Sequence, residues 1–512
     1  MIESKIIKKG NLIPEKEWSR HIDSLKSEHK KQKLDFKKEF INAVNKRLHG
    51  KRFGILFSGG IDSTLIAFVC KKLNADFICY TVGLENSPDI IAAEQTAKKY
   101  GFELKKRIIS LEEIEKTIKE VAGIVGPDTM KVGVGAVVYE AVKLAKKDKI
   151  NDLFSGLGSE EIFAGYERHS LSKDVNLECW SGLKSMYQRD FLRDFSIAKV
   201  LDVNVLVPFL DPNVIMSAMQ IPGEEKIKEG YKKYALRKSA EETGLKDAWR
   251  KKKAAQYGSC FDKAIQKLAK KNNFKYKKNY INSLFPIGAL VSSGKDSVYA
   301  MYRMIKQDFP VKCMITLRSL NPDSYMFHTP AIDMVKLQSE STGIPLIEQE
   351  TAGEKEDELM DLRKALEKAK ERFGIKGVVT GALYSDYQRE RIEKTCSETG
   401  LLPFSPLWHM DQENYMRELI RNNFKIILTR IAAEGLDESW LGRILTEEDV
   451  DRLIELNKKI KLSVCGEGGE FETLVLDCPL FNKELKVIRT KKVMDSKFSG
   501  TLIITEIKMV EK

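Results

Sequence analysis

The stretch FGILFSGGIDSTLIAFVCKKL, residues 53–73, has a counterpart in IGALVSSGKDSVYAMYRMIKQ, residues 287–307. Each stretch begins with a short apolar run of strand character, passes through a loop of Ser and Gly, and continues with apolar residues at helical spacing. Superposing the loops aligns Asp62 with Asp296, and the serine after each aspartate is shared. The chain therefore contains a duplicated strand, loop and helix.

Strand-like and helix-like segments alternate after each loop, as in ADFICYTVG, PDIIAAEQTAKKYG and FELKKRIIS of the first half. Such alternation predicts βαβ units with a parallel sheet, so we expect two doubly wound α/β domains. The last stretch differs, because three strand-like segments follow one another with turns between them, at 473–480, 483–493 and 500–510. We expect a small mixed or antiparallel β-rich appendix there.

The length of 512 residues exceeds what one core usually supports, which predicts two to four domains. Residues 1–285 carry a net charge of +16, whereas residues 286–512 carry −4. The lysine-rich polar stretch between the halves has the composition of a tether. The expected parts are a basic N-terminal helical segment (1–49), a first α/β domain (50–271), a linker (272–285), a second α/β domain (286–400) and a C-terminal α+β part (401–512).

The composition argues against several classes of protein. No apolar run reaches the roughly 18 residues of a membrane span, and the first residues lack the apolar core of a signal peptide. The eight cysteines never stand at a C-x-x-C spacing, which disfavours zinc ribbons and dithiol redox centres. We therefore expect a cytoplasmic protein without a membrane partner. A solvated helix face explains the basic run between Lys246 and Lys278 better than a nucleic-acid partner does.

The two loops have the properties of an anion site. Backbone N–H groups and hydroxyls at a helix N-terminus bind phosphate oxygens, and the helix dipole favours the negative charge. An aspartate inside such a loop is explained by Mg²⁺, which bridges a carboxylate to phosphate oxygens, so Asp62 and Asp296 are the predicted Mg²⁺ ligands. The predicted phosphate-binding residues are Ser58, Gly59, Gly60, Asp62 and Ser63 in the first loop and Ser292, Ser293, Gly294, Lys295, Asp296 and Ser297 in the second.

This S-G-G-x-D-S pattern resembles the loop of the PP-loop ATP pyrophosphatases, which bind the pyrophosphate end of ATP. The resemblance implies that both α/β domains have the adenine nucleotide alpha hydrolase-like fold. It also implies that ATP is cleaved between its α- and β-phosphates and that AMP is transferred to a carboxylate or a base oxygen. The reaction class follows from the resemblance, whereas the substrate does not.

The second half resembles the diphthine–ammonia ligases over most of residues 287–482. The resemblance rests on SSGKDS (292–297), DSYMFHTP (323–330), GALYSDYQRERIE (381–393), SPLWHMDQ (405–412), EGLDESWLGR (434–443) and CGEGGEFETLVLDCPLF (465–481). It implies an ATP-dependent ligase that forms diphthamide on translation elongation factor two from diphthine and ammonium, releasing AMP and pyrophosphate. Ser293 stands where glycine is commoner, and we expect it to fit by keeping φ below zero.

Several side chains of the second half are candidates for this chemistry. Glu467, Glu470 and Glu472 surround two glycines, and carboxylates there could hold Mg²⁺, attract ammonium or take its proton. The predicted helix SDYQRERIE follows the strand KGVVTG at the sheet edge where open α/β sheets bind ligands. The candidate catalytic residues are Lys295, Asp296, Arg391, Glu467 and Glu470, and the candidate substrate-binding residues are His328, Tyr387, Gln388, Trp408 and Glu472.

Residues 50–260 resemble the synthetase domain of asparagine synthetases. The matching segments are FSGGIDST (57–64), TVGLENSPDI (81–90), SGLGSEEIFAGYERH (155–169), VPFLDP (207–212) and KYALRKSA (233–240). The resemblance adds Gly83, Gly156, Gly158 and Lys252 to the predicted ATP site, with Lys253 a rival of Lys252.

The first half also departs from that family. Leu157 stands where the family has a glutamate, and Asn204 and Leu206 replace its E-x-R pattern. Losing a carboxylate that serves the amination step argues against asparagine synthesis, while ATP binding can survive. The roughly fifty residues ahead of the domain are too few for a glutaminase domain, so we expect no glutamine-derived ammonia.

Three alternatives stay open at this point. The first half could make asparagine from aspartate and ammonia, with the second half as a separate activity. A tRNA-modifying PP-loop enzyme of the thiolation or lysidine type would use the basic first half, but the paired cysteines usual for thiolation are missing. The first half could also be a non-enzymatic docking module for the ribosome-associated factor. The oligomeric state cannot be read from the sequence.

Overall fold

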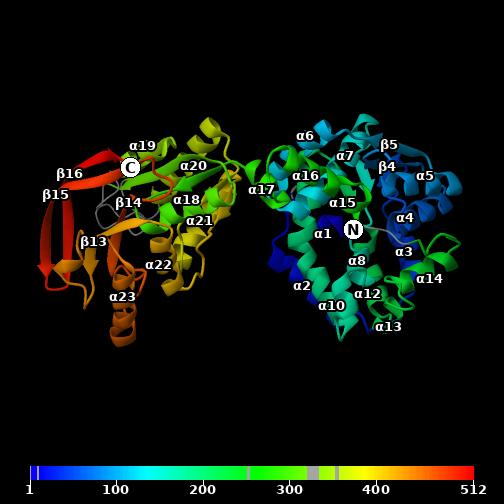
Figure 1. The fold of residues 1–512 in the computed structure, drawn as a ribbon. Helices are drawn as coiled ribbons and strands as arrows, with labels where there is room; N and C mark the ends of the chain where they lie inside the picture. The colour runs from blue at the N-terminus through cyan, green and yellow to red at the C-terminus, as the bar shows by residue number, and fades with distance from the viewer. Residues whose placement is uncertain (1, 9–10, 251–253, 320–333, 352–356) are drawn as a thin grey trace. The chain divides into compact units, whose positions relative to one another are not determined.

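The computed structural model describes the whole chain except residues 1, 9–10, 251–253, 320–333 and 352–356 (Figure 1). The chain divides into two compact units, Met1–Ile281 and Asn282–Lys512. This division falls inside the segment 272–285, which was expected to be a linker. That segment contains helix α17 (Lys277–Ser283), in which Tyr280 and Ile281 are buried. The connection is therefore partly folded, because its aromatic and aliphatic side chains have apolar surface to cover.

The first unit is built on a five-stranded parallel sheet with the order β5-β4-β3-β6-β7. Its strands are β3 (Phe53–Leu56), β4 (Phe77–Gly83), β5 (Leu104–Ile108), β6 (Asp152–Phe154) and β7 (Asn204–Leu206). Phe77 and Cys79 of β4 belong to one buried cluster, whereas Ile78 and Tyr80 belong to another. Side chains alternate between the two faces of a strand, so both faces of this sheet are covered and the predicted doubly wound α/β domain is confirmed.

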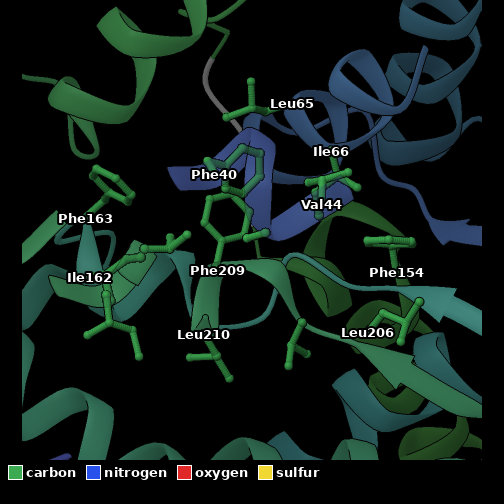
Figure 2. Close-up of a cluster of buried hydrophobic side chains, with 14 of the residues drawn as sticks. Phe40, Val44, Leu65, Ile66, Phe154, Ile162, Phe163, Leu206, Phe209 and Leu210 are labelled. Carbon is green, nitrogen blue, oxygen red and sulfur yellow. The ribbon is translucent and has the colours of Figure 1, made fainter. Parts of the chain in front are cut away.

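The N-terminal segment 1–49 is not a separate part. Trp18 of α2 (Glu15–Glu28) and Phe40 and Val44 of α3 (Phe36–Asn45) are buried in the same cluster as side chains of the first sheet and its helices. The ring centroids of Phe40 and Phe209 lie 4.6 Å apart, and Figure 2 shows these two rings in contact. The inner faces of these helices therefore complete the core of the first unit, and Arg47 of the segment is itself buried, paired with Glu3 and Asp211.

The helices of the first unit connect the strands and cover the sheet (Figure 1). They are α1 (Glu3–Ile6), α2 (Glu15–Glu28), α3 (Phe36–Asn45), α4 (Ile61–Lys72), α5 (Pro88–Tyr100), α6 (Leu111–Val125), α7 (Thr129–Lys147), α8 (Ser159–Ile162), α9 (Glu167–Leu171), α10 (Val175–Met186), the π-helix η1 (Tyr187–Phe191), α11 (Leu192–Val200), the 3₁₀ turn η2 (Pro208–Leu210), α12 (Pro212–Met219), α13 (Gly223–Lys226), α14 (Tyr234–Glu242), α15 (Ala255–Gly258) and α16 (Phe261–Lys271). The short strands β1 (Ile7–Lys8) and β2 (Asn11–Leu12) pair with each other.

The second unit repeats the arrangement with the order β10-β9-β8-β11-β12, again all parallel. Its strands are β8 (Ile287–Leu290), β9 (Val311–Ser319), β10 (Leu346–Thr351), β11 (Gly377–Val379) and β12 (Leu402–Phe404). Met314 of β9 joins one buried cluster, and its neighbours Cys313 and Ile315 join the other. The second doubly wound domain is confirmed as well. In both units the strand order reverses at the strand that precedes the Ser–Gly loop, where open α/β sheets bind ligands.

The C-terminal part forms a four-stranded antiparallel sheet with the order β14-β13-β16-β15. Its strands are β13 (Lys425–Ala432), β14 (Phe471–Asp477), β15 (Lys483–Ser496) and β16 (Ser499–Glu511). The predicted mixed or antiparallel appendix is confirmed as an antiparallel sheet, but β13, one of its two central strands, was not foreseen. Leu428 and Leu474 of this sheet share a buried cluster with Ile287 and Met314, so residues 401–512 complete the core of the second unit.

The helices of the second unit are α18 (Lys295–Lys306), α19 (Met334–Thr342), α20 (Asp357–Phe373), α21 (Asp386–Thr399), α22 (Gln412–Arg421), the 3₁₀ turn η3 (Glu438–Trp440) and α23 (Glu447–Ile460).

In the part of the chain that the structure describes, no single helix is long and apolar enough to cross a membrane. Only α6 and α7 taken together pass such a test by length and composition, and they are bent by 114° at the break between them. Both helices contribute to the buried side chains of the first unit.

A buried lysine makes the stability of the first unit depend on pH. Lys226 is fully buried, with Met219 Sδ 3.4 Å from its Nζ, and burial lowers its pKa from 10.5 to about 8. Between these two values the unfolded chain binds more protons than the folded one, so stability rises with pH. Relative to Lys226→Met, the free energy of unfolding of the wild type should rise by about 2 kcal/mol between pH 8 and pH 10.

Urea-induced unfolding of the full chain at several pH values measures this difference. Replacement of the exposed Lys238 by Met is the matched control, and it should leave the pH dependence of the wild type unchanged. A pH dependence of Lys226→Met that parallels the wild type would contradict the assignment.

Candidate functional site

The two Ser–Gly loops have the same internal hydrogen bonds. In the first loop, Ser58 N lies 3.4 Å from Ser63 Oγ, and Ser63 Oγ lies 3.4 Å from Gly60 O. In the second, the corresponding distances are 3.1 Å for Ser292 N to Ser297 Oγ and 3.1 Å for Ser297 Oγ to Gly294 O. The serine that closes each sequence motif therefore folds the loop back on itself, and the next helix begins directly after Gly60 and Gly294. The duplication seen in the sequence extends to the backbone path.

Ser293 does not keep the negative φ that we expected. Its φ is +69°, close to the +61° of Gly59 in the first loop. Two donors fix its carbonyl oxygen, because Val475 N lies 3.1 Å and Gln338 Nε2 lies 3.0 Å from it. The surrounding structure therefore imposes the loop conformation, and Ser293 adopts a backbone region that costs a non-glycine residue about 1–2 kcal/mol.

In the first unit, the loop aspartate pairs with a buried lysine that directly precedes a helix far along the chain. Lys233 Nζ lies 2.8 and 2.9 Å from the two carboxylate oxygens of Asp62, 2.7 Å from Glu160 Oε1 and 3.1 Å from Ser159 Oγ. Lys233 is buried and precedes α14 with a φ of +55°. It begins the segment KYALRKSA, which the sequence analysis quoted without assigning this residue a role. The quoted motif therefore contains this lysine, but nothing in the motif indicates that Asp62 is its partner.

The first loop opens into a pocket of ≈ 1010 Å³. Ser58, Asp62, Ser63 and Gly156 line it, as predicted residues of the ATP site, together with Leu157. Gly158 instead takes a φ of +96° at the start of α8, where a Cβ would lie 2.4 Å from Leu210. At Gly83 a Cβ would lie 2.3 Å from Ser87 Oγ, so this glycine permits close packing at the end of β4. Lys252 and its rival Lys253 lie outside the described residues.

Another wall of this pocket carries a buried ionic network that the sequence analysis missed. Arg189 contacts Glu161, and its Nη2 lies 2.7 Å from Asp190 Oδ2. The π-helix η1 carries Arg189 and Asp190, and such helices are frequent at functional sites. Burial raises the pKa of Glu161 to about 7, with a further contribution from the negative charge of Asp190. The site therefore lacks a carboxylate at position 157, where Leu157 stands, but it retains those of Glu161 and Asp190.

In the second unit, the loop supplies the lysine itself. Lys295 Nζ lies 3.0 and 2.9 Å from the carboxylate oxygens of Asp296, the residue that follows it. Tyr415 donates its hydroxyl to Asp296 Oδ1 at 2.7 Å. Lys295 is buried, and its Nζ lies 5.8 Å from the ring centroid of Tyr415 and 5.6 Å from that of Phe471. The equivalent of Lys295 in the first loop is Ile61, so the two units reach the same ion pair by different routes.

The second loop lines a pocket of ≈ 290 Å³. The predicted residues that line it are Ser292, Gly294, Lys295, Asp296, Ser297, Gln388, Glu467 and Glu472. Thr473 also lines it and was missed, although its Oγ1 accepts a hydrogen bond from Lys295 N at 3.1 Å. Strand β14, which carries Glu472 and Thr473, therefore brings the C-terminal sheet to the loop.

Glu467 lines this pocket and has a raised pKa. The residue as a whole is exposed, but partial burial of its carboxyl raises the pKa, and the negative charge of Asp296 adds to this shift. Lys295 acts in the opposite direction. A carboxylate with a raised pKa is a better proton acceptor near neutral pH than an ordinary glutamate.

Other candidates of the second half lie outside the pocket lining. Glu470 accepts hydrogen bonds from Ser463 N at 2.9 Å and from Gly468 N at 2.8 Å, so it stabilises the turn that carries Glu467. The Arg391 guanidinium lies 4.8 Å from the ring centroid of Tyr387. Trp408 stacks in the same way with Arg389, at 4.2 Å. His328 lies outside the described residues.

The loop aspartates suit a magnesium ion that arrives with a nucleotide. Within the described residues, no three His, Cys, Asp or Glu side chains gather at one point to form a protein metal site. Magnesium commonly binds through one or two carboxylates together with phosphate oxygens and water. Asp62 and Asp296 each face a pocket beside a Ser–Gly loop, which provides that one carboxylate. The donor set therefore fits Mg²⁺ bound to ATP.

Family comparisons divide the chain as the fold does. Residues 286–403 match the diphthamide synthase N-terminal domain, and residues 411–510 match the diphthamide synthase C-terminal domain. Residues 35–176 and 169–276 match asparagine synthase. The N-terminal helix α3 thus belongs to the synthase-like region, in agreement with its place in the core.

Curated relatives fall into the same two groups. Diphthine–ammonia ligases of Mus musculus and Homo sapiens are 39% and 37% identical over 229 residues, which are 41% of this chain and 85% of each relative. A putative glutamine-hydrolysing asparagine synthetase of Methanocaldococcus jannaschii is 36% identical over 278 residues, which are 46% of this chain. The chain spans about half of the length of that relative, at 51%.

The first loop gives a test of its backbone path. A Cβ on Gly59 would lie 2.7 Å from the carbonyl oxygen of Ala92, in addition to the strain of a φ of +61°. Gly50 has a φ of +70° but no atom within 4 Å of the added Cβ. We expect Gly59→Ala to lower the free energy of unfolding of the first unit by about 3 kcal/mol, and Gly50→Ala by about 1 kcal/mol. Urea titration measures both, and equal losses would contradict the close approach of loop and helix.

Proposed function

The chain belongs to the diphthine–ammonia ligase family through its second unit, and we propose that this unit adenylates the diphthine carboxylate of translation elongation factor two and lets ammonia displace AMP. The observation that carries this proposal is the pocket in which an anion-binding loop, an ion-paired lysine and a glutamate of raised pKa meet. An ATP-dependent amide ligase needs these three groups for phosphate, for developing negative charge and for a proton.

The first step is the activation of the carboxylate. A carboxylate oxygen attacks the α-phosphorus of ATP, a bond to AMP forms, and pyrophosphate leaves with the electrons of the broken P–O bond. The start of α18 and the loop hydroxyls favour the negative charge of the departing pyrophosphate. Lys295 can stabilise the negative charge of the pyrophosphate, because its ammonium lies at the pocket wall beside Asp296.

The second step is the attack of ammonia on the acyl adenylate. The nitrogen forms a bond to the carbonyl carbon, and AMP leaves with the electrons of the broken C–O bond. The proton that the attached nitrogen loses to become an amide goes to the departing phosphate or to water. Ammonium must first lose a proton, and Glu467 is placed in the pocket lining to accept it. Asp296 is the residue that would hold Mg²⁺, which supplies positive charge to the phosphates when it is bound.

The first unit is proposed to bind ATP without making asparagine. Its loop aspartate, the buried Lys233 and the ≈ 1010 Å³ pocket support nucleotide binding. Leu157 presents an aliphatic side chain at the position where an amide-forming relative needs a carboxylate. We propose that this unit assists the second one and that both are soluble parts of one cytoplasmic enzyme.

Loop variants separate the contributions of the two units. With ATP, ammonium and diphthine-bearing elongation factor two, Asp296→Asn should lower AMP formation by about 100-fold or more. The variant would lose the carboxylate that holds Mg²⁺, and with it the stabilisation of the negative charge on the phosphates in the transition state. Asp62→Asn should change it by no more than about twofold. Quantifying AMP and pyrophosphate by mass spectrometry gives both results.

The exposed Asp495 provides a control, and Asp495→Asn should behave like the wild type. Aspartate offered in place of the elongation factor should give no AMP. The proposal fails if Asp62→Asn rather than Asp296→Asn abolishes AMP formation, or if aspartate is the better acceptor.

A further inference from the structure

A tyrosine of the C-terminal part reaches the aspartate of the second loop from behind the pocket. Tyr415 lies on α22, is fully buried, and donates its hydroxyl to Asp296 Oδ1 at 2.7 Å. The hydroxyl is the donor of this bond, because an ionised carboxylate only accepts hydrogen bonds.

The ring of Tyr415 is held as firmly as its hydroxyl. Its centroid lies 5.7 Å from that of Tyr299 on α18, the helix that carries Asp296. The centroid of the Tyr415 ring lies 5.8 Å from Lys295 Nζ. One buried side chain thus contacts the aspartate through its hydroxyl and the lysine through its ring, without lining the pocket itself.

The lysine and the tyrosine bind the same carboxylate but differ in what a nucleotide does to them. The ammonium of Lys295 is attracted to phosphate oxygens, which compete with Asp296 for it. The hydroxyl of Tyr415 is buried behind the carboxylate, so an incoming phosphate does not compete for it. When the ion pair opens, the hydrogen bond from Tyr415 remains.

We propose that Tyr415 is a positioning residue that holds Asp296 in the orientation needed for a metal–nucleotide complex after Lys295 has moved to the phosphates. This inference rests on the proposed function only in that the second loop binds ATP. It goes beyond that function by assigning metal-dependent nucleotide binding to a residue of the C-terminal part. The first unit holds its aspartate differently, with Lys233, which directly precedes α14.

The two loops can be separated in a binding experiment on the full chain. Calorimetry with ATP plus Mg²⁺, and with ATP plus a chelator, is carried out in a background of Asp62→Asn so that the first loop contributes little. Tyr415→Phe should raise the Kd for ATP with Mg²⁺ about tenfold, because a hydrogen bond to a charged acceptor is lost. The Kd for ATP without metal should change by no more than about twofold.

Tyr299→Phe is the matched control. Tyr299 lies in the same aromatic layer and donates to a carboxylate at the same distance, 2.7 Å to Glu418 Oε2, but this carboxylate is not in the pocket. Its loss should leave both Kd values within about twofold of the background. Circular dichroism and thermal unfolding verify that each variant is folded.

A double-mutant cycle with Asp296→Asn supplies a second measurement. If Tyr415 acts through Asp296, Tyr415→Phe should have no additional effect on the Mg²⁺-dependent Kd once the carboxylate is gone. Equal losses with and without Mg²⁺, no loss in either condition, or a full tenfold effect in the Asp296→Asn background would overturn the inference. The assay contains no acceptor protein, so its outcome is independent of whether diphthine is the substrate.

Discussion

A carboxylate placed at the N-terminus of a helix and paired with a buried lysine is the constraint around which each unit is organised. Burying the lysine ammonium alone would be costly, so it requires the partly exposed carboxylate beside it. Asp62 pairs with Lys233, which directly precedes α14 and lies 171 residues further along the chain, whereas Asp296 pairs with its neighbour Lys295. In the first unit the ion pair therefore connects two segments far apart in the sequence. In the second unit the ion pair is local, and the contact to a distant segment is the hydrogen bond from Tyr415 to Asp296.

This difference explains why the two sites are unlike although their loops superpose. In the second unit, β14 of the antiparallel sheet approaches the loop, with Thr473 Oγ1 accepting from Lys295 N and Val475 N donating to Ser293 O. The pocket is ≈ 290 Å³, compared with ≈ 1010 Å³ in the first unit. An appendix that looks peripheral in the sequence thus becomes a wall of the pocket beside the second loop.

The sequence predicts the local parts well because loop chemistry and strand–helix alternation are local signals. Both parallel sheets and the position of Asp296 beside the second loop follow from these signals, while the C-terminal sheet was expected only as mixed or antiparallel, and Glu467 came from its place among glycines. Contacts between distant segments were not predicted. Nothing in the sequence around Lys233 indicates that it pairs with Asp62, and Tyr415 is indistinguishable from any other aromatic residue in a helix. The positive φ of Ser293 was missed for the same reason, since donors far along the chain impose it.

The central claim is that the second unit activates a carboxylate by adenylation, and oxygen transfer tests it most directly. Elongation factor two bearing diphthine labelled with ¹⁸O in its carboxylate is converted with ATP and ammonium, and the AMP and pyrophosphate are analysed by mass spectrometry. The account predicts that one labelled oxygen appears in AMP, because the carboxylate oxygen attacks the α-phosphorus and stays with it when ammonia displaces the adenylate. Label in orthophosphate or pyrophosphate, or unlabelled AMP alongside amide product, would contradict it.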